Sequence, residues 1–384
     1  MGSKGINSKI GVLGGGQLGK MLAQAAADWN LDISVLDPTP QAPANCCAKQ
    51  VHGDFNNYDN VLAFGQQQDI ITIEIEHVNL EALKELKRLG KEVYPDPSSL
   101  GLIQDKGLQK LFYREHQLPT SEFIIVDNAV HIHQLIEQNI IAFPFVQKLR
   151  RAGYDGRGVQ IIHEESELDK LFNEPSVIEQ KVAIHKEIAV LAARNISGEI
   201  MIYDPVEMLF HPTANLLLYQ ECPCTLNGDQ SEQVKNLAHT LIEKMNIVGL
   251  LAVELFLDKK GNILINEVAP RPHNSGHHTI EACPTSQFQQ HLRCILDFPL
   301  GPALTNVHSI LLNLLGEPGY QGEAIYEGIE ECLALDGVYI HLYGKKETKP
   351  MRKMGHITIV GKDPVYVKKI ATSVSEKIKV IAHL

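Results

Sequence analysis

Residues 9–20, KIGVLGGGQLGK, constrain the fold more than any other segment of this sequence. An apolar run that closes on glycines and continues as a helical pattern is typical of the strand, tight turn and helix of a parallel α/β sheet. Gly14, Gly16 and Gly19 have the G-x-G-x-x-G spacing of dinucleotide-binding turns. Asp37 ends the next apolar run, where such turns are followed by a ribose-binding acid.

The glycine turn by itself fits three kinds of site. It fits a nicotinamide-dependent oxidoreductase, and it fits a turn that only packs a strand against a helix. Gly14, Gly19 and Lys20 also satisfy much of the P-loop pattern, but Met21 lacks the hydroxyl that holds Mg²⁺ there. No later segment resembles a hydride-transfer site, whereas the middle of the chain has the residues of phosphoryl chemistry.

Length and charge exclude several classes of protein. A chain of 384 residues predicts two or three domains, and a net charge of −11 argues against general nucleic-acid binding. No apolar window is long enough for a membrane span, and the first residues lack the apolar core of a secretory signal. Seven cysteines, an odd number, argue against a disulfide framework. We therefore predict a cytoplasmic protein without a membrane or nucleic-acid partner.

Strand and helix patterns alternate through the first hundred residues, which predicts a parallel sheet. Strands are predicted at 9–14, 31–37 and 69–78, and helices at 19–30 and 80–90.

Changes in composition divide the chain into three parts. Prolines near residue 100 predict a domain boundary, and a strand-rich middle region follows. The tail has short β-like runs at 337–344 and 355–361, which predict a small, mainly β domain. We predict an α/β fold with domains at 1–100, 101–300 and 301–384.

Two carboxylates mark the sequence GLLAVELFLDKKGNILINEVAPR. It has the pattern of a β-hairpin with its turn at 259–262, and counting outward places Glu254 opposite Glu267. Like charges directly opposite each other are destabilising, and both flanks are apolar. The pair therefore needs a cation or a shared proton, and Mg²⁺ prefers a few carboxylates together with substrate phosphates. The hairpin predicts a magnesium–nucleotide site; the alternative is two solvated acids on an exposed face.

Polar residues follow this hairpin directly in APRPHNSGHH. Arg271 is suited to stabilise a transferring phosphoryl group or an acyl phosphate. His273 and His277 have a spacing that could hold zinc on a helix, but the proline and glycine between and beside them favour a loop. We predict that this segment, including Asn274 and His278, supplies polar contacts to substrate.

A second glycine-rich loop, KLRRAGYDGRGVQ, combines flexible backbone with basic side chains at 148–160. Such a loop lets backbone N–H groups approach phosphate oxygens and suits a lid over a nucleotide. The alternative is an ordinary basic hairpin turn. Lys148 ends an apolar run and is expected to point into a cleft. The segment 177–182, VIEQKV, is similar to a linker between two lobes.

Together these motifs resemble the ATP-grasp ligases, and within them the N5-carboxyaminoimidazole ribonucleotide synthetases of bacterial purine biosynthesis. The resemblance rests on GVLGGGQLGKML, TIEIEHV, RRAGYDGRG, NEVAPRPHNSGHHT and YGKKETKPMRKMGH, and it extends from about residue 9 to about residue 365. It implies a Rossmann-like first domain, a two-lobed ATP-grasp region and a small β-rich last domain. It also implies that ATP and bicarbonate carboxylate 5-aminoimidazole ribonucleotide, through carboxyphosphate, with release of ADP and phosphate. A homodimer is expected.

The resemblance also implies roles for individual residues. It assigns catalysis to Arg271 and Asn274, and Mg²⁺, or Mn²⁺ in its place, to Glu254 and Glu267. It assigns ATP to Lys106, Lys148, Gly153, Tyr154, Asp155, Gly156, Arg157, Gly158, Val159, Glu179, Gln180, Lys181, Val182, Glu187, His211, Asn266 and Glu267. It assigns the ribonucleotide to Gln17, Leu18, Glu74, Tyr154, Arg157, Asn274, Lys345 and Arg352.

The sequence departs from the family pattern at Ala269, where many ATP-grasp enzymes carry an asparagine metal ligand. Asn266 and Asn274 are the candidates to replace it. Alternative functions are a formate-dependent glycinamide ribonucleotide transformylase, a biotin carboxylase, a nicotinamide-dependent oxidoreductase and a nucleotide sensor without turnover.

Overall fold

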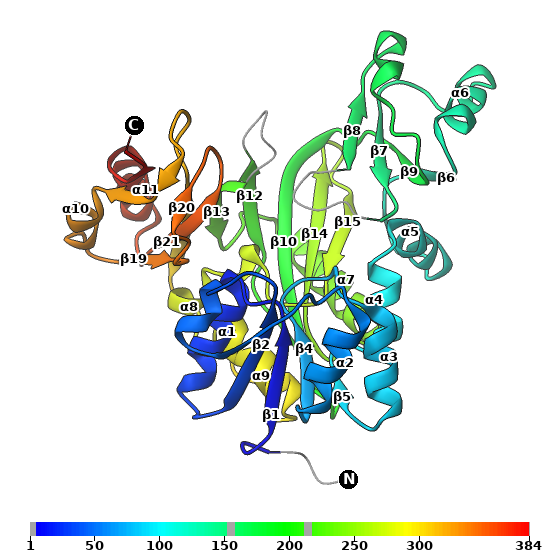
Figure 1. The fold of residues 1–384 in the computed structure, drawn as a ribbon. Coiled ribbons are helices and arrows are strands. Elements are labelled where there is room, and N and C mark those ends of the chain that lie inside the picture. The colour runs from blue at the N-terminus through cyan, green and yellow to red at the C-terminus, as the bar shows by residue number, and fades with distance from the viewer. Residues whose placement is uncertain (1–4, 152–157, 211–216, 384) are drawn as a thin grey trace.

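The structure is a computed structural model that describes residues 5–151, 158–210 and 217–383 (Figure 1). In these ranges the strands form a five-stranded, a four-stranded and a nine-stranded sheet, with two small two-stranded sheets near the C-terminus. No helix within the same ranges has the length and apolar character needed to cross a membrane.

The N-terminal sheet is parallel throughout, with strand order β3-β2-β1-β4-β5. Its elements are β1 (Lys9–Leu13), α1 (Gln17–Ala27), β2 (Asp32–Asp37), η1 (Pro43–Cys46), β3 (Lys49–His52), α2 (Tyr58–Gln66), β4 (Ile70–Ile73), α3 (Leu80–Arg88) and β5 (Glu92–Val93). The predicted parallel sheet is confirmed. The prediction missed β3 and β5 because they are short, and β4 ends five residues before the predicted strand because the chain turns at Glu74.

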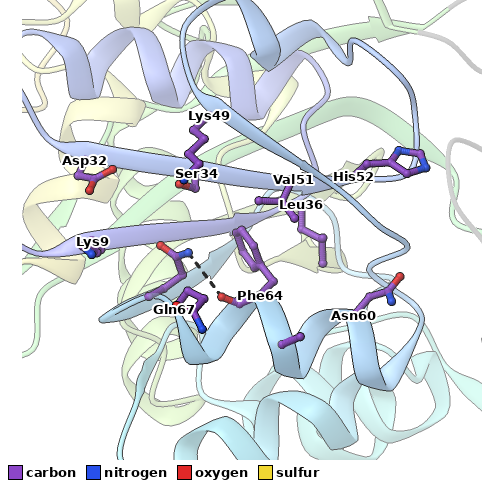
Figure 2. A pocket seen from close by; sticks show the side chains of 12 residues that line it. Lys9, Asp32, Ser34, Leu36, Lys49, Val51, His52, Asn60, Phe64 and Gln67 are labelled. Atoms are coloured by element: carbon purple, nitrogen blue, oxygen red, sulfur yellow. Dashed lines mark hydrogen bonds between the residues drawn. The ribbon is translucent and has the colours of Figure 1, made fainter.

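A groove of about 410 Å³ runs between α2 and the strands β2 and β3 (Figure 2). Ser34 and Lys49 from these strands face it, together with Phe64 and Asn60 from α2. The groove exists because the connection from β2 to β3 is the short η1, which packs on α1 instead of covering this face. None of the predicted site residues lines it.

The next segment forms a separate lobe, at the upper right of Figure 1, around the antiparallel sheet β6-β9-β7-β8. It is reached through α4 (Pro97–Ile103) and α5 (Lys106–Glu115). Its own elements are β6 (Phe123–Val126), α6 (Ala129–Glu137), β7 (Phe145–Leu149), β8 (Val159–Ile162), η2 (Glu165–Lys170) and β9 (Ser176–Gln180).

The largest sheet has the order β15-β14-β10-β12-β13-β16-β21-β19, with β11 beside β10. It is built from β10 (Ile184–Arg194), β11 (Ile200–Ile202), β12 (Val206–Phe210), β13 (Leu217–Cys222), β14 (Gly249–Asp258), β15 (Ile263–Ala269), β16 (His308–Leu315), β19 (Val338–Leu342) and β21 (Lys353–Gly361). The C-terminal strands therefore extend the middle region's sheet, through the pairing of β13 with β16.

The remaining elements pack around this sheet or at the C-terminus. They are α7 (Gly228–Lys244), η3 (Asn274–Gly276), α8 (Thr279–Ala282), α9 (Gln287–Ile295), β17 (Gly322–Glu323), β18 (Ile325–Glu327), α10 (Ile329–Leu333), β20 (Glu347–Thr348), α11 (Pro364–Lys377) and β22 (Lys379–Ile381).

Strand alternation decides which face of β14 is core and which is site. Leu251, Val253 and Leu255 belong to the hydrophobic cluster that includes the buried residues of α7. Because successive side chains point to opposite faces, Glu254 faces away from that cluster. The acid thus lies on the side of the sheet that is turned from α7.

Truncating this core should destabilise the protein strongly. Leu251 is 0% exposed, so Leu251→Ala should lower the free energy of unfolding by about 2–5 kcal/mol through lost burial and a residual cavity. Leu209 in β12 is 49% exposed, and Leu209→Ala should change it by less than about 0.5 kcal/mol. Urea unfolding of the two variants checks this; equal losses would contradict the assigned core.

Candidate active site

The carboxylate hairpin forms with the predicted pair opposed. β14 and β15 are antiparallel, and Glu254 lies opposite Glu267. Nearer the turn the register differs by one residue from the predicted count, because Leu255 pairs with Ile265. Asn266 is the extra residue of a β-bulge, which restores the predicted pairing at Glu267. The bulge presents both Asn266 and Glu267 to the lysines of the neighbouring lobe.

Two lysines meet the bulge from different elements. Lys106 Nζ, at the start of α5, lies 2.5 Å from Glu267 Oε2. Lys148 Nζ, in β7, donates to Asn266 Oδ1 at 2.8 Å. Asp105 caps α5 and also pairs with Arg150 at 2.8 Å, so the helix start is clamped to the end of β7. The predicted residues Lys106, Lys148, Asn266 and Glu267 therefore come together.

The two acids are held in different electrostatic environments. Burial raises the pKa of Glu254, and the charges of Glu267 and Glu187 raise it further. The ammonium of Lys106 lowers the pKa of Glu267 and outweighs the effect of burial there. Among the described residues no group of three His, Cys, Asp or Glu side chains could hold a metal ion. Two opposed carboxylates fit a Mg²⁺ that takes its other ligands from substrate phosphates and water.

A second charged network joins Lys110, Glu179 and Lys148, and the sequence prediction missed Lys110. Lys110 is 3% exposed and donates to Thr120 Oγ1 at 2.6 Å and to Ser121 Oγ at 3.0 Å. Glu179 lies between Lys110 at 3.1 Å and Lys148 at 3.0 Å. Lys110 follows Lys106 by four residues on one helix face, a spacing that could have flagged it.

The charges of this network set its protonation. Burial alone raises the pKa of Glu179, but Lys148 and Lys110 outweigh burial and bring it to about 2. Burial lowers the pKa of Lys110 to about 8 despite the attraction of Glu179. The Glu179 carboxylate is thus paired with two lysines of the protein itself.

The connection between the lobes overlaps only the end of the predicted linker at 177–182, because residues 177–180 belong to β9. Gln180 ends β9, Lys181 and Val182 follow, and β10 begins at Ile184. Glu187 lies on β10 beside the metal-site strand, and burial raises its pKa to about 6.

The glycine-loop prediction falls mostly outside the described residues. Gly158, with φ +73°, and Val159 at the start of β8 are described. The following predicted residues are not: Gly153, Tyr154, Asp155, Gly156, Arg157 and His211.

The first glycine turn is filled by carboxylates of the protein itself. Glu74 Oε1 accepts from Gly16 N at 2.5 Å, and its other oxygen accepts from Gly19 N. Asp37 Oδ2 accepts from Gly15 N at 2.8 Å. These are the N–H groups that a dinucleotide pyrophosphate would use, so the structure does not support the oxidoreductase alternative. Burial raises the pKa of Glu74, against the effect of its two backbone hydrogen bonds.

The glycine turn and the hairpin meet through Arg271. Its Nη2 lies 2.9 Å from Glu76 Oε1, close behind β4. His273 Nε2 lies 3.8 Å from Glu254 Oε1, and Asn274 begins η3. An ion pair therefore joins the segment that follows the metal-site hairpin to the segment that follows β4 of the N-terminal sheet.

Four of the predicted ribonucleotide ligands come from α1 and from the segments beside β19 and β21. Gln17 begins α1, whereas the side chain of Leu18 is 8% exposed and packs in the core. Lys345 follows β19, and Arg352 precedes β21 and donates to the Glu347 carbonyl at 2.8 Å.

The prediction that His277 and His278 contact substrate is wrong. They are 0% and 2% exposed, and His277 stacks on His356 with 4.5 Å between ring centroids. Burial lowers the pKa of His278 to about 4. Ala269 is also buried, opposite Ala252, and is no ligand position. An apolar interior holds these imidazoles neutral, as core residues.

Three family profiles match successive parts of the chain. They describe a ribonucleotide synthetase preATP-grasp domain at 7–104, an ATP-grasp domain at 111–288 and a phosphoribosylaminoimidazole carboxylase C-terminal domain at 309–369. The chain is 36% identical, over 91% of its length and 89% of the relative's, to the N5-carboxyaminoimidazole ribonucleotide synthase of Synechococcus elongatus. The chain belongs to the N5-carboxyaminoimidazole ribonucleotide synthase family. The predicted ATP-grasp fold is confirmed.

Longer relatives and solved structures agree with this family. The phosphoribosylaminoimidazole carboxylase of Candida glabrata is 38% identical over 91% of the chain. The chain spans 63% of that protein and no more than 66% of similar fungal and plant relatives.

The crystal structure of the Thermotoga maritima N5-carboxyaminoimidazole ribonucleotide synthetase superposes with TM-score 0.89 at 39% identity, covering 98% of this chain and 100% of that chain. A synthase from Aspergillus clavatus, crystallised with ADP and 5-aminoimidazole ribonucleotide, has TM-score 0.87 at 28% identity over 97% and 98% of the two chains.

Removing the charge of the buried Glu179 carboxylate should destabilise the protein. Glu179→Gln leaves Lys110 and Lys148 without a counter-charge and should lower the free energy of unfolding at pH 7 by about 3–5 kcal/mol. Because the folded pKa of Glu179 lies below its ordinary value of 4.5, its stabilisation is present above pH 4.5 and is lost as pH falls toward 2.

The difference in the free energy of unfolding between wild type and Glu179→Gln should therefore become smaller as pH falls below 4.5. Urea unfolding at pH 7, 4.5 and 3.5 measures it. The control is Glu85→Gln, which breaks an exposed pair with Arg88 and should cost less than about 1 kcal/mol. A gap that stays constant with pH would refute the assigned charge states.

Proposed function

We propose that this protein catalyses the ATP- and bicarbonate-dependent carboxylation of 5-aminoimidazole ribonucleotide, forming N5-carboxyaminoimidazole ribonucleotide, ADP and phosphate. The observation that carries the proposal is the opposed pair Glu254 and Glu267, flanked by Lys106 and Lys148, in a family whose relatives bind ADP and this ribonucleotide. A cross-strand pair of acids beside two ammonium groups suits a metal-bound polyphosphate better than any neutral ligand.

The chemistry follows from the groups of the site. A bicarbonate oxygen attacks the γ-phosphorus of ATP, ADP leaves, and carboxyphosphate results. The exocyclic amine of the ribonucleotide then attacks the carbonyl carbon of carboxyphosphate and expels phosphate, or carboxyphosphate first breaks into phosphate and CO₂ and the amine attacks CO₂. On both routes the nitrogen loses one proton as the N–C bond forms. Bound Mg²⁺, held by Glu254 and Glu267, would neutralise phosphate charge in the first step. A transformylase or an oxidoreductase is not supported by the family match.

Lysines complete the nucleotide half of the site. Lys106 and Lys148 exchange their present acceptors, Glu267 and Asn266, for phosphate oxygens when nucleotide binds. The backbone of 180–182 receives the adenine, and Glu187 accepts from the ribose. The loop at 153–159 is the proposed cover of the phosphates. These assignments, together with His211, stay predictions.

The ribonucleotide half lies on the other side of Arg271. Arg271 is placed between Glu76 and the hairpin, where it can reach carboxyphosphate, and Asn274 begins the adjoining turn. Gln17 and Glu74 line the glycine turn, and Lys345 and Arg352 bind the phosphate monoester. A few local cations suffice for one phosphate in an acidic protein. The homodimer and the cytoplasmic location also stay predictions.

Neutralising one metal carboxylate should stop the first step. Glu267→Gln keeps the shape of the side chain but removes the charge that holds the metal, so ADP formation should fall by about a hundredfold or more. Glu243→Gln, at an exposed position of α7, is the matched control and should keep full activity. ADP release measured at saturating magnesium and ATP compares them; unchanged turnover in Glu267→Gln would refute the metal assignment.

The substrate assignment is tested by ADP release from magnesium–ATP and bicarbonate. Addition of 5-aminoimidazole ribonucleotide should stimulate release, and the ADP formed should match the carboxylated product mole for mole. Stimulation by glycinamide ribonucleotide and formate instead would move the protein to the transformylases. No turnover with either substrate would leave a nucleotide-binding protein without this activity.

A further inference from the structure

The segment 342–346, between β19 and β20, is fastened to the N-terminal domain on both sides of Lys345. Tyr343 is 1% exposed and packs in the hydrophobic cluster that includes Leu18 and Leu22 of α1. Its hydroxyl lies 3.1 Å from His356 Nδ1. A residue of the C-terminal domain therefore fills part of the N-terminal core.

Lys20 makes a direct polar link across this joint. Its ammonium donates to the carbonyl of Leu342 at 2.9 Å, although the two residues are 322 positions apart. A Cβ placed on Gly344 would lie 3.7 Å from the same nitrogen, so Lys20 also lines the turn before Lys345. Gly344 has φ +80°, the left-handed conformation that reverses the chain between the buried Tyr343 and Lys345.

Lys20 also belongs to the helix that carries the glycine-turn ligand. It follows Gln17 by three residues on α1, so the two side chains lie on neighbouring positions of one helix face. Lys346 Nζ donates to Gln41 Oε1 at 2.7 Å, which fixes the far end of the segment. The Lys345 ammonium itself donates to the Lys353 carbonyl at 2.6 Å. The contacts of Tyr343, Lys20 and Lys346 therefore fix the backbone of the segment that carries Lys345.

We propose that Lys20 is a positioning residue of the ribonucleotide site, which holds the Lys345 segment at a fixed distance from the glycine turn. The inference deepens the proposed function and rests on it, because Lys345 is proposed to bind the substrate phosphate and Gln17 is proposed to contact the same substrate from the glycine turn. Two such contacts bind one substrate more tightly when the distance between them is set in advance. The charge-assisted hydrogen bond to Leu342 sets it.

The test is Lys20→Met, which keeps the aliphatic stem and removes the donor. The KM for 5-aminoimidazole ribonucleotide should rise about tenfold, the scale of one lost charge-assisted hydrogen bond, while kcat and the KM for ATP stay within about twofold. Amide hydrogen exchange of residues 342–346 should become faster. Lys20→Arg should restore both, since guanidinium also donates to a carbonyl. Lys49→Met, an exposed lysine of β3, is the control.

The outcomes separate this role from the reaction. If the wild type has no ribonucleotide-dependent turnover, the proposed function falls and the positioning role falls with it. If the wild type shows ribonucleotide-dependent turnover but Lys20→Met leaves the KM for the ribonucleotide unchanged, the positioning role alone is overturned. The same holds if Lys20→Met lowers kcat and raises the KM for ATP as well. If Lys20→Met does not fold, Lys20→Gln is compared with the wild type in its place. Unchanged amide hydrogen exchange of residues 342–346 in that variant would refute the role of Lys20 in holding this segment.

Discussion

The repulsion between Glu254 and Glu267 is the constraint on which the rest of the site depends. Two acids opposed across an antiparallel pair destabilise a hairpin unless cations compensate them. The compensation comes from another lobe, because Lys106 lies at the start of α5 and Lys148 in β7. Asp105 and Arg150 then hold these two elements together. The charge of one hairpin thus explains why the four-stranded lobe faces it.

The charges of the protein itself also explain why the glycine turn is not a phosphate-binding site. Helix N-termini attract anions, and a turn of this spacing usually leaves that position to a phosphate. Here Glu74 and Asp37 already accept from the N–H groups of Gly15, Gly16 and Gly19. These N–H groups are therefore already satisfied by carboxylates of the protein, and the half-buried side chain of Gln17 lies next to them on α1.

Hydrophobic burial and long-range hydrogen bonds then join the domains. Tyr343 from the C-terminal part fills the N-terminal core, and Thr72 of β4 meets His291 of α9 at 2.9 Å. The C-terminal strands continue the large sheet through β13 and β16. These contacts hold side chains that are far apart in the sequence in fixed positions relative to one another.

The parallel N-terminal sheet and the family could be predicted from the sequence, because both follow from local patterns. Counting outward from the turn named the pair Glu254 and Glu267, but the two acids are opposed only because the bulge at Asn266 offsets a register that differs by one residue from that count. The bulge, the burial of His277 and His278, and the roles of Lys110 and Lys20 depend on packing between distant parts of the chain. Their contacts join elements that are distant along the chain, such as Lys110 with Glu179 and Lys20 with Leu342. The periodicity of the sequence predicts on which face of a helix or strand a side chain lies, but only tertiary packing determines which residues that face contacts.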